Sequence, residues 1–322
     1  MKPLLGVTIA VTAILLAGSV SGQAGYPEKP MRIIVGFPPG NSLDAVARLL
    51  GQKLAEAWTK PVITENVPGA AGNIAADRVA KATPDGYTLG LLSQTQLVVN
   101  PSLYRLPYDP VTDFAPISQV TLSPILLVVH NAVPANSVKE LVVLARARPD
   151  ELTFASGGNG SGTHMPAELF KFAANVDVRH IPYKGVVAAI PDLLGGRVTM
   201  MFSPIGTVLP STREGKLRAL AVTSSRRSLA APELPTFAES GYPGFEYTLW
   251  FGLIAPARTP AVVVKKLHSV TVKALALPDL RAKLLDLGLE EIGNSPDEFA
   301  VVIKNGMPKW AKIIKDAGIR PD

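Results

Sequence analysis

The sequence predicts an α/β protein with two lobes that are joined by two crossing strands. Apolar strands alternate with amphipathic helices, first over residues 31–92 and again over 138–223. Two long β-prone runs, 117–130 and 245–255, follow the first alternation and the second. A chain of 322 residues is also too long for one comfortable hydrophobic core, whereas it suits two α/β domains of ordinary size.

The first lobe is expected to begin with strand Met31–Phe37 and a helix from Leu43 to Trp58. The apolar residues of that helix recur at helical spacing, which predicts that one face docks on a sheet: Val46, Leu49, Leu50, Leu54 and Trp58. The alternation continues with strand 61–66, a helix that carries Ile74 and Val79, and strand Thr88–Leu92. This order predicts a mostly parallel sheet with both faces covered.

The segment Ile117–His130 is expected to cross into the second lobe, where the alternation returns. The expected elements are helix Val138–Ala147, strand Leu152–Ala155, helix Met165–Ala174, strand Val178–Ile181, helix Val186–Leu194, strand Arg197–Phe202, helix Thr207–Glu214 and strand Leu217–Thr223. Phe245–Ala255 is the expected return crossing. Three helices that should pack back on the first lobe follow: Ala261–Ala276, Pro278–Leu287 and Pro296–Ala317. The first lobe is therefore predicted to contain residues 25–124 and 249–322, and the second lobe residues 125–248.

The N-terminus has the pattern of a secretory signal peptide. Met1-Lys2 precedes an apolar run, Leu4–Leu16, and small residues follow up to Ala24. The run is shorter than the ~20 residues that a membrane span needs, although an uncleaved membrane anchor is the alternative. We expect cleavage after Ala24, which would remove residues 1–24 as the signal peptide.

The chain contains no cysteine, so no disulfide supports the fold and no cysteine can accept a lipid anchor. An exported protein without such an anchor is retained by an outer membrane, and the expected location is the periplasm. Removal of Lys2 with the signal leaves 31 basic against 26 acidic residues, a net charge of about +5. Because these charges are scattered, no nucleic-acid partner is expected.

A glycine-rich loop follows a strand and precedes a helix at two places about 120 residues apart. The first runs through Pro38-Pro-Gly-Asn-Ser-Leu-Asp44. Gly40 and Asn41 can adopt positive φ there, and Ser42 can cap the helix, so that the N–H groups of residues 41–43 face a cleft. Asp44 is expected to complement the helix dipole or to brace the loop rather than to act in catalysis.

The second loop, Ser156-Gly-Gly-Asn-Gly-Ser-Gly-Thr-His164, has more glycine than a tight turn needs. Loops of this kind aim backbone N–H groups and a helix N-terminus at one spot, which suits an anion. The pair predicts an anion that is gripped from both lobes. Ser93, Tyr183 and Ser203 lie at or just after the ends of predicted strands and are expected to border the same crevice, although Tyr183 can equally pack beneath it.

Ser161 and His164 suggest a nucleophile and base, which leaves an exported serine hydrolase as the competing function. The Gly160-Ser161-Gly162 run lacks the spacing of a nucleophile elbow, however, and His164 is better explained as a brace of the loop. The remaining histidines, His130, His180 and His268, share no metal-ligand spacing. We therefore expect no catalytic residue, no metal and no cofactor.

Together these motifs resemble the solute-binding receptors of tripartite tricarboxylate transporters, the Bug-type family, along nearly the whole chain. The motifs that carry the resemblance are Tyr26-Pro-Glu-Lys-Pro30, Phe37-Pro-Pro-Gly40 with Asp44, Glu65-Asn-Val-Pro-Gly69, Pro84-Asp-Gly-Tyr-Thr-Leu89, Tyr108-Asp-Pro110, Asp113-Phe-Ala-Pro-Ile117, the Ser156–His164 loop, His180-Ile-Pro-Tyr-Lys-Gly185, Asp192-Leu-Leu-Gly-Gly196, Gly215-Lys-Leu-Arg-Ala-Leu-Ala-Val222 and Trp250-Phe-Gly-Leu-Ile-Ala-Pro256.

The resemblance implies a periplasmic-binding-protein fold of the Venus-flytrap kind, type II-like, that delivers a small organic carboxylate to a two-subunit membrane permease. It implies ligand contacts in two groups of residues: Gly40, Asn41, Ser42 and Asp44 in the first loop, and Ser156, Gly157, Gly160, Ser161 and Thr163 in the second. Asn41 stands where a second glycine is usual, so its side chain could narrow the pocket or touch the ligand. A monomer is expected, and presentation of the liganded form to a membrane kinase is a further alternative.

Overall fold

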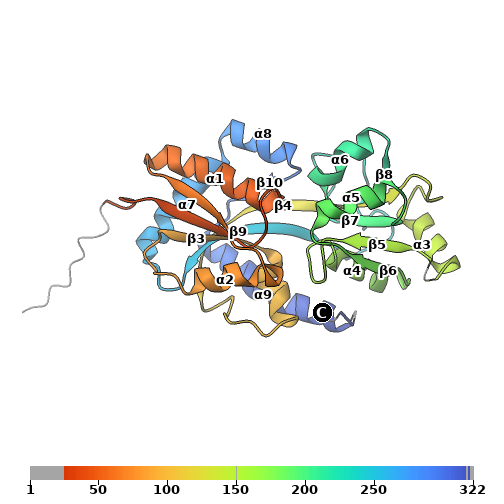
Figure 1. The fold of residues 1–322 in the computed structure, drawn as a ribbon, viewed down its shortest axis with the longest axis horizontal. Helices are drawn as coiled ribbons and strands as arrows, with labels where there is room; N and C mark the ends of the chain where they lie inside the picture. The colour runs from red at the N-terminus through yellow and green to blue at the C-terminus, as the bar shows by residue number, and fades with distance from the viewer. Residues whose placement is uncertain (1–24, 150, 317, 320–322) are drawn as a thin grey trace, which may run out of the picture.

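The computed structural model describes residues 25–149, 151–316 and 318–319. Figure 1 shows two lobes side by side along the longest axis, with two long strands running between them. The strands form one curled sheet in the order β2-β1-β3-β9-β4-β7-β5-β6, and β8 and β10 also pair with β4. The predicted signal peptide, residues 1–24, lies outside the described residues.

Three parallel strands form the sheet of the first lobe: β2 (Val62–Asn66), β1 (Met31–Val35) and β3 (Thr88–Ser93). Two helices connect them: α1 (Ser42–Trp58) and α2 (Asn73–Ala80). The predicted apolar face of α1 is buried at Val46, Leu50 and Leu54. The helix therefore docks on the sheet as its periodicity indicated.

The two crossing strands are β4 (Phe114–His130) and β9 (Thr248–Pro256), which pair antiparallel from Phe114–Pro256 to Pro124–Thr248. Beyond Pro124, β4 pairs instead with the strands of the second lobe. A short strand, β10 (Glu290–Glu291), adds to the first-lobe half of β4. These pairings confirm that both segments link the lobes.

The second lobe contains four further strands: β7 (Met200–Pro204), β5 (Thr153–Ser156), β6 (Arg179–Pro182) and β8 (Leu217–Val222). Its helices are α3 (Val138–Ala147), α4 (Met165–Ala174), α5 (Val186–Leu194) and α6 (Ile205–Arg213). The bounds of α3, α4 and α5 are the predicted ones.

The C-terminal helices pack on elements of the first part of the chain. They are α7 (Ala261–Leu275), α8 (Pro278–Asp286) and α9 (Pro296–Asp316). Helix α7 contacts β4 and α1, whereas α9 contacts β4 and the segment after β3. Figure 1 shows α1 and α8 on one side of the first-lobe sheet, and α2 and α9 on the other.

The expected mostly parallel sheet is wrong for the molecule as a whole, because the sheet is mixed. Strands β1, β2 and β3 are parallel, as are β5, β6 and β7, but β9 runs antiparallel to β3 and β4 runs antiparallel to β7. One crossing strand leads from the first lobe to the second and the other leads back, so the two run in opposite directions. They therefore cannot both be parallel to the strands beside them. The precise lobe boundaries, residues 124/125 and 248/249, remain a prediction.

The segment after β3 was not predicted to be helical. It forms one wide turn, Thr95–Val99, and one tight turn, Asn100–Ser102, and all of Thr95–Asn100 is buried. Helix α9 covers this segment. This segment therefore lies inside the first lobe, and the residue that follows it, Leu103, contacts the second loop.

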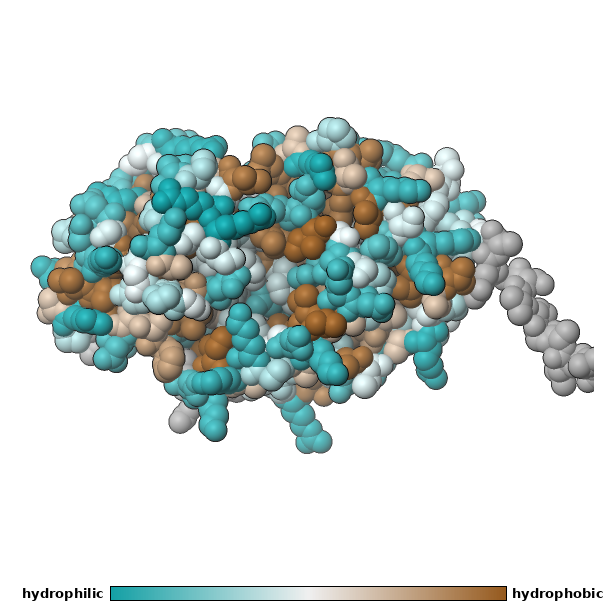
Figure 2. Space-filling model, turned by 180° about the vertical axis from the view of Figure 1, so that it is seen from behind, coloured by the Kyte–Doolittle hydropathy of each residue, from teal (hydrophilic) through white to brown (hydrophobic). Residues whose placement is uncertain are grey.

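Figure 2 shows the face of the molecule that is turned away in Figure 1. Hydrophilic side chains cover most of it, and hydrophobic ones appear in small separate groups. Over the described ranges, which leave out positions 1–24, 150, 317 and 320–322, no helix has both the length and the apolar character to cross a bilayer.

Candidate functional site

The first loop leads from β1 into α1 through an exposed Gly40 with φ +91°. Asn41, and not Ser42, is the N-cap of the helix, and its φ is −89°. Its Oδ1 accepts a hydrogen bond from the N–H of Asp44 at 3.1 Å, while its Nδ2 donates to the carbonyl of Pro38 at 2.5 Å. The expectations of a Ser42 cap and a positive φ at Asn41 are therefore wrong, because the longer Asn41 side chain caps the helix from extended backbone.

Asp44 fixes the shape of this loop. Its side chain is 4% exposed, and it accepts hydrogen bonds from Gly40 N at 3.1 Å, Arg48 Nε at 3.0 Å and Asn66 Nδ2 at 2.9 Å. Burial opposes its ionisation, but these hydrogen bonds prevail and lower the pKa of Asp44. Asn66 also donates to the carbonyl of Phe37 at 3.0 Å. Asp44 therefore braces the loop, and its oxygens are already engaged.

The first turn of α1 leaves three donors unused. Within the described ranges, the N–H groups of Asn41, Ser42 and Leu43 donate to no protein atom. Such donors stand at the positive end of the helix dipole. Because Asn41 and Ser42 are also partly accessible, this end of α1 is able to bind an anion.

The second loop is held together mainly by its own polar groups. Gly157 N donates to Thr163 Oγ1 at 2.8 Å, and Gly160 N donates to His164 Nδ1 at 3.1 Å. Ser161 Oγ lies 3.1 Å from Thr163 Oγ1 and accepts from the N–H of His164 at 3.2 Å. The loop is thus pre-shaped before any ligand binds.

Three donors of this loop remain unused as well. In the part of the chain that the structure describes, the N–H groups of Asn159, Gly162 and Thr163 donate to no protein atom. Gly162 also lies just before α4. The second loop therefore offers backbone donors beside a helix N-terminus, as the first loop does.

Gly160 was expected to contact the ligand, but it is buried. Its φ is +68°, and a Cβ built on it would lie 3.2 Å from Leu103 Cδ1 and 3.5 Å from the hydroxyl of Tyr104. Gly162 would likewise meet Leu249 Cδ1 at 2.9 Å. The second loop therefore packs closely against the other lobe and against β9, which leaves no room for a side chain at these positions.

Gln96 ties the segment after β3 to Gly72 and lies against Gly36, the residue after β1, and it was not predicted from the sequence. Its Oε1 accepts from Ser93 N at 2.7 Å and from Ser93 Oγ at 2.9 Å, and its Nε2 donates to the carbonyl of Gly72 at 3.0 Å. A Cβ on Gly36 or Gly72 would lie 2.5 Å from Gln96 Nε2. Two glutamines within a buried apolar run, at 94 and 96, were the available signal.

The segment that begins with Gln96 ends at Leu103, which contacts Gly160 of the second loop. One continuous segment therefore contacts Gly36, which precedes the first loop, at one end and Gly160 of the second loop at the other. Each set of free N–H groups follows the carboxyl end of a strand, β1 for the first loop and β5 for the second.

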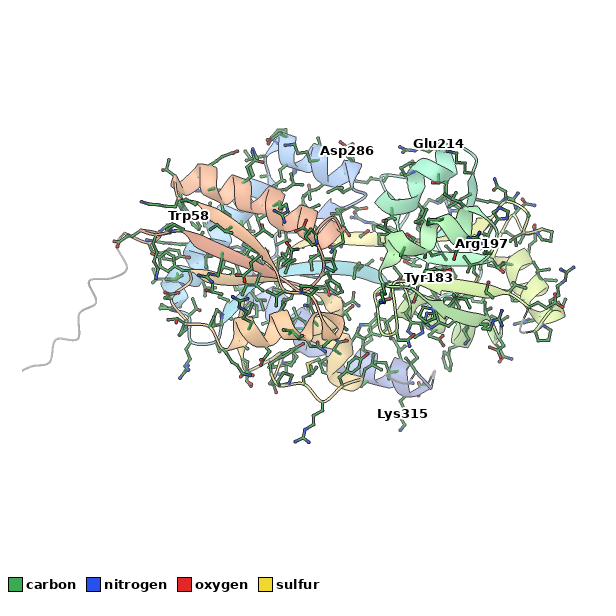
Figure 3. The ribbon with its side chains drawn as sticks, in the orientation of Figure 1. Trp58, Tyr183, Arg197, Glu214, Asp286 and Lys315 are labelled. Atoms are coloured by element: carbon green, nitrogen blue, oxygen red, sulfur yellow. The ribbon has the colours of Figure 1, made fainter. Side chains whose placement is uncertain are left out.

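The other residues that were predicted to border the crevice are less accessible to a ligand. Ser93 is 3% exposed and Ser203 is 0% exposed, and Ser203 Oγ donates to the carbonyl of Pro204 at 3.4 Å. Tyr183 is half-buried, and its hydroxyl donates to Asp192 Oδ2 at 2.7 Å. Figure 3 labels Tyr183 at the end of the second lobe that faces the first lobe. Ser93 and Ser203 do not reach solvent in this conformation.

The serine and histidine of the hydrolase alternative do not form a catalytic pair. The ring of His164 accepts from Gly160 N and faces Glu168 Oε1 at 3.5 Å, while Ser161 Oγ is engaged with Thr163. A different serine, Ser156, lies 2.6 Å from a histidine, His180 Nε2, but its side chain is fully buried. Among the described residues, no three His, Asp or Glu side chains gather as metal ligands do.

A family model described as the tripartite tricarboxylate transporter family receptor matches residues 46–319. The chain belongs to this family. The receptor is 37% identical over 317 residues to the UPF0065 protein in the tcbD-tcbE intergenic region of Pseudomonas sp. strain P51, a match that covers 97% of this chain and 93% of the relative. It is 36% identical over 318 residues to protein BugT of Bordetella pertussis, covering 98% and 97% of the two chains.

Solved structures agree with this assignment. The receptor is similar to periplasmic binding protein BugD, with a TM-score of 0.83 and 36% identity over 92% of this chain and 100% of that one. Rpa4515 of R. palustris with adipate gives a TM-score of 0.86 and 35% identity, with the same coverage. MatC of Rhodopseudomonas palustris with bound malate gives 0.81 and 32%, covering 90% and 100%. The two-lobed periplasmic-binding-protein fold is thereby confirmed.

Proposed function

We propose that this receptor captures a small organic carboxylate between its two glycine loops and delivers it to a two-subunit membrane permease. The observation that carries the proposal is two pairs of unused N–H groups. Those of Ser42 and Leu43 lie at the start of α1 on one lobe, and those of Gly162 and Thr163 lie just before α4 on the other. Membership of the receptor family supports the transport role.

Backbone donors suit a carboxylate for a physical reason. Hydrogen bonds to a charged acceptor are shorter and stronger than those between neutral groups, and helix dipoles add to them without a buried cation. The cations nearest these loops are already engaged: Arg48 binds Asp44 and Asn66 at the first loop. Lys184, on the approach to α5, is exposed. We therefore expect no single lysine or arginine to be indispensable for binding.

Two structural neighbours were solved with dicarboxylates, adipate and malate. Short aliphatic dicarboxylates are for this reason the first compounds to test. The Asn41 side chain is held within the loop rather than extended towards a ligand, because its amide oxygen and its amide nitrogen are both hydrogen-bonded to loop residues. Its presence in place of a glycine therefore gives no reason to expect a smaller ligand.

The site residues carried into this proposal are those of the two loops whose backbone or side chains remain accessible: Gly40, Asn41, Ser42, Gly157 and Ser161. Asp44, Ser156 and Gly160 are assigned as buried supports of these loops, whereas Thr163, which is also buried, contributes its unused N–H to the site. We also propose that the protein is exported to the periplasm, that the signal peptide is cleaved near Ala24 and that the mature receptor is a monomer. Sequencing the N-terminus of the secreted protein tests the cleavage.

The test of function is a thermal-shift screen of mono-, di- and aromatic carboxylates on the mature chain, followed by calorimetry and by mass spectrometry of the recovered compound. A receptor gains melting temperature with at least one carboxylate and returns it intact. Stabilisation by neutral or cationic compounds alone, or conversion of the bound carboxylate to a product, would contradict the proposal.

A further inference from the structure

Two imidazole rings are stacked directly behind the second loop. The ring centroids of His164 and His180 are 4.2 Å apart, and the ring planes differ by 24°. His180 also stacks on Phe154, with centroids 4.6 Å apart. Since His164 is 6% exposed and Phe154 is fully buried, this stack belongs to the interior of the second lobe.

The bond from the loop to His164 requires one particular form of the ring. Nδ1 accepts the N–H of Gly160 at 3.1 Å, which needs a lone pair on that nitrogen. The proton of the neutral ring is then on Nε2, which faces Glu168 Oε1 at 3.5 Å. A doubly protonated His164 cannot accept the Gly160 N–H.

The second ring holds the other end of the loop. His180 Nε2 lies 2.6 Å from Ser156 Oγ, and that hydroxyl accepts the N–H of Gly158 at 3.1 Å. Burial, and then the neighbouring His164, lower the pKa of His180 to about 4. His180 therefore stays neutral at ordinary pH.

We propose that the His164–His180 stack is an acid-labile lock on the second loop, so that protonation of His164 releases the Gly160 N–H and weakens ligand binding. The added proton places a charge against the second imidazole and removes the acceptor at the same time. The charged groups that face the stack are Glu168 and Lys171, both on α4. Lys171 also pairs with Asp177 at 3.6 Å, in the connection to β6.

Release of the loop has a consequence outside the second lobe. Gly160 packs against Leu103 of the first lobe, so a loop that leaves its place also loses this contact. His164 acts in this account as a positioning residue, because it touches the loop and not the ligand. The effect on affinity rests on the proposed function, whereas the release of the loop does not.

The first experiment follows the loop without any ligand. In the mature chain labelled with 15N, imidazole and amide resonances are recorded from about pH 8 down to about pH 5, the range in which histidines usually titrate. We expect the neutral His164 ring to carry its proton on Nε2, and the Gly160 amide to shift upfield as that ring gains a second proton. A Gly160 amide that stays in place while His164 titrates would overturn the lock.

The second experiment compares variants with adipate as the probe. His164→Asn keeps an oxygen acceptor close to the place of Nδ1 but does not titrate, whereas His164→Leu has no acceptor. We expect the Kd of the wild type to rise at least ~10-fold (about 1.4 kcal/mol) between about pH 7.5 and pH 5. The rise should be less than ~3-fold in His164→Asn, and His164→Leu should already bind ~10-fold more weakly near pH 7.5.

His268→Asn is the matched control, because His268 bonds to the carbonyl of Asn294 in another part of the fold. It should keep the wild-type pH profile. Equal pH profiles for wild type and His164→Asn would overturn the proposal. If adipate binds no form of the protein, that result concerns the ligand class of the proposed function, and the Gly160 resonance alone decides the lock.

Discussion

Asp44 joins three separate pieces of the first loop through one buried carboxylate. Gly40, Arg48 and Asn66 all donate to it, so its removal leaves several donors without a partner. A hydrogen bond to a charged group typically contributes about 1.5–3 kcal/mol. The position of Gly40, and with it the direction of the free N–H groups, depends on this residue.

We predict that Asp44→Ala lowers the free energy of unfolding by about 2 kcal/mol and weakens carboxylate binding. Urea denaturation and calorimetry measure the two effects. Glu214→Ala is the control, since the Glu214–Lys216 pair is exposed and its loss should change stability by less than about 0.5 kcal/mol. An Asp44 variant as stable as the control would show that the carboxylate does not brace the loop.

The half-buried His180 predicts how stability depends on pH. A histidine in the unfolded chain binds a proton near its usual pKa of 6.5, whereas the folded ring does so only at about 4. Between these values the unfolded state binds more protons, so the free energy of unfolding falls as the pH is lowered through this window.

His180→Gln keeps an amide near Ser156 and does not titrate, so its loss of stability between about pH 6.5 and pH 4 should be smaller than that of the wild type. Chemical denaturation over this pH range measures the difference. The variant His268→Gln should retain the wild-type slope. Identical slopes for His180→Gln and the wild type would mean that His180 is not held neutral by the fold.

At the scale of elements, helices could be predicted more closely than the chain segments between them. The bounds of α3, α4 and α5 follow from apolar spacing and from the residues at their ends, which are local signals. The turns at 95–102 carry no such signal, because their buried residues serve contacts with α9 and Gly72 that only the folded chain brings together.

The glycines in the sequence were enough to predict the two loops, but they did not show the role of each glycine. Gly40 has open space where a Cβ would be, whereas Gly160 packs against Leu103, a residue 57 positions away in the chain. A glycine that gives room to a ligand and one that gives room to a neighbouring segment look alike in sequence. The Asn41 cap was likewise hidden, since Asn41 and Ser42 are both good N-caps.

The two glycines should therefore respond differently to substitution. Gly40→Val places a β-branched residue at φ +91° in open space, and we expect strain of about 1–3 kcal/mol with weakened binding. Gly160→Val adds the clash with Leu103 to similar strain, so it should destabilise the ligand-free protein more than Gly40→Val does. Thermal unfolding of both variants measures this order, and the reverse order would contradict the packing described for the second loop.

At the scale of the whole molecule, a second contact between the lobes lies at the start of α6. A Cβ on Gly206 would lie 2.0 Å from the carbonyl oxygen of Leu287, and one on Gly288 would lie 2.2 Å from Ile205 Cγ2. Helix α6 begins at this contact and α8 ends just before it. Figure 1 shows the two helices on facing sides of the two lobes. The lobes therefore meet backbone to backbone here, on the side of the molecule away from α9.

Gly206→Ala should force these backbones apart and shift the receptor towards a more open form. We expect at least ~10-fold weaker carboxylate binding, about 1.4 kcal/mol, and a larger radius of gyration by small-angle scattering. Gly51→Ala is the control, because Gly51 lies inside α1, has no positive φ, and a Cβ on it would meet its nearest atom, Val62 Cγ1, at an ordinary 3.4 Å. An unchanged radius and affinity in Gly206→Ala would mean that this contact does not set the angle between the lobes.

The central claim is that one carboxylate is held by backbone donors of both loops at once. An amide 15N NMR titration of the mature receptor with the carboxylate that stabilises it most tests this directly. The account predicts that the amides of Ser42 and Leu43 and those of Gly162 and Thr163 shift together, with one common saturation curve. Shifts confined to one loop, or to neither while the ligand is bound, would contradict it.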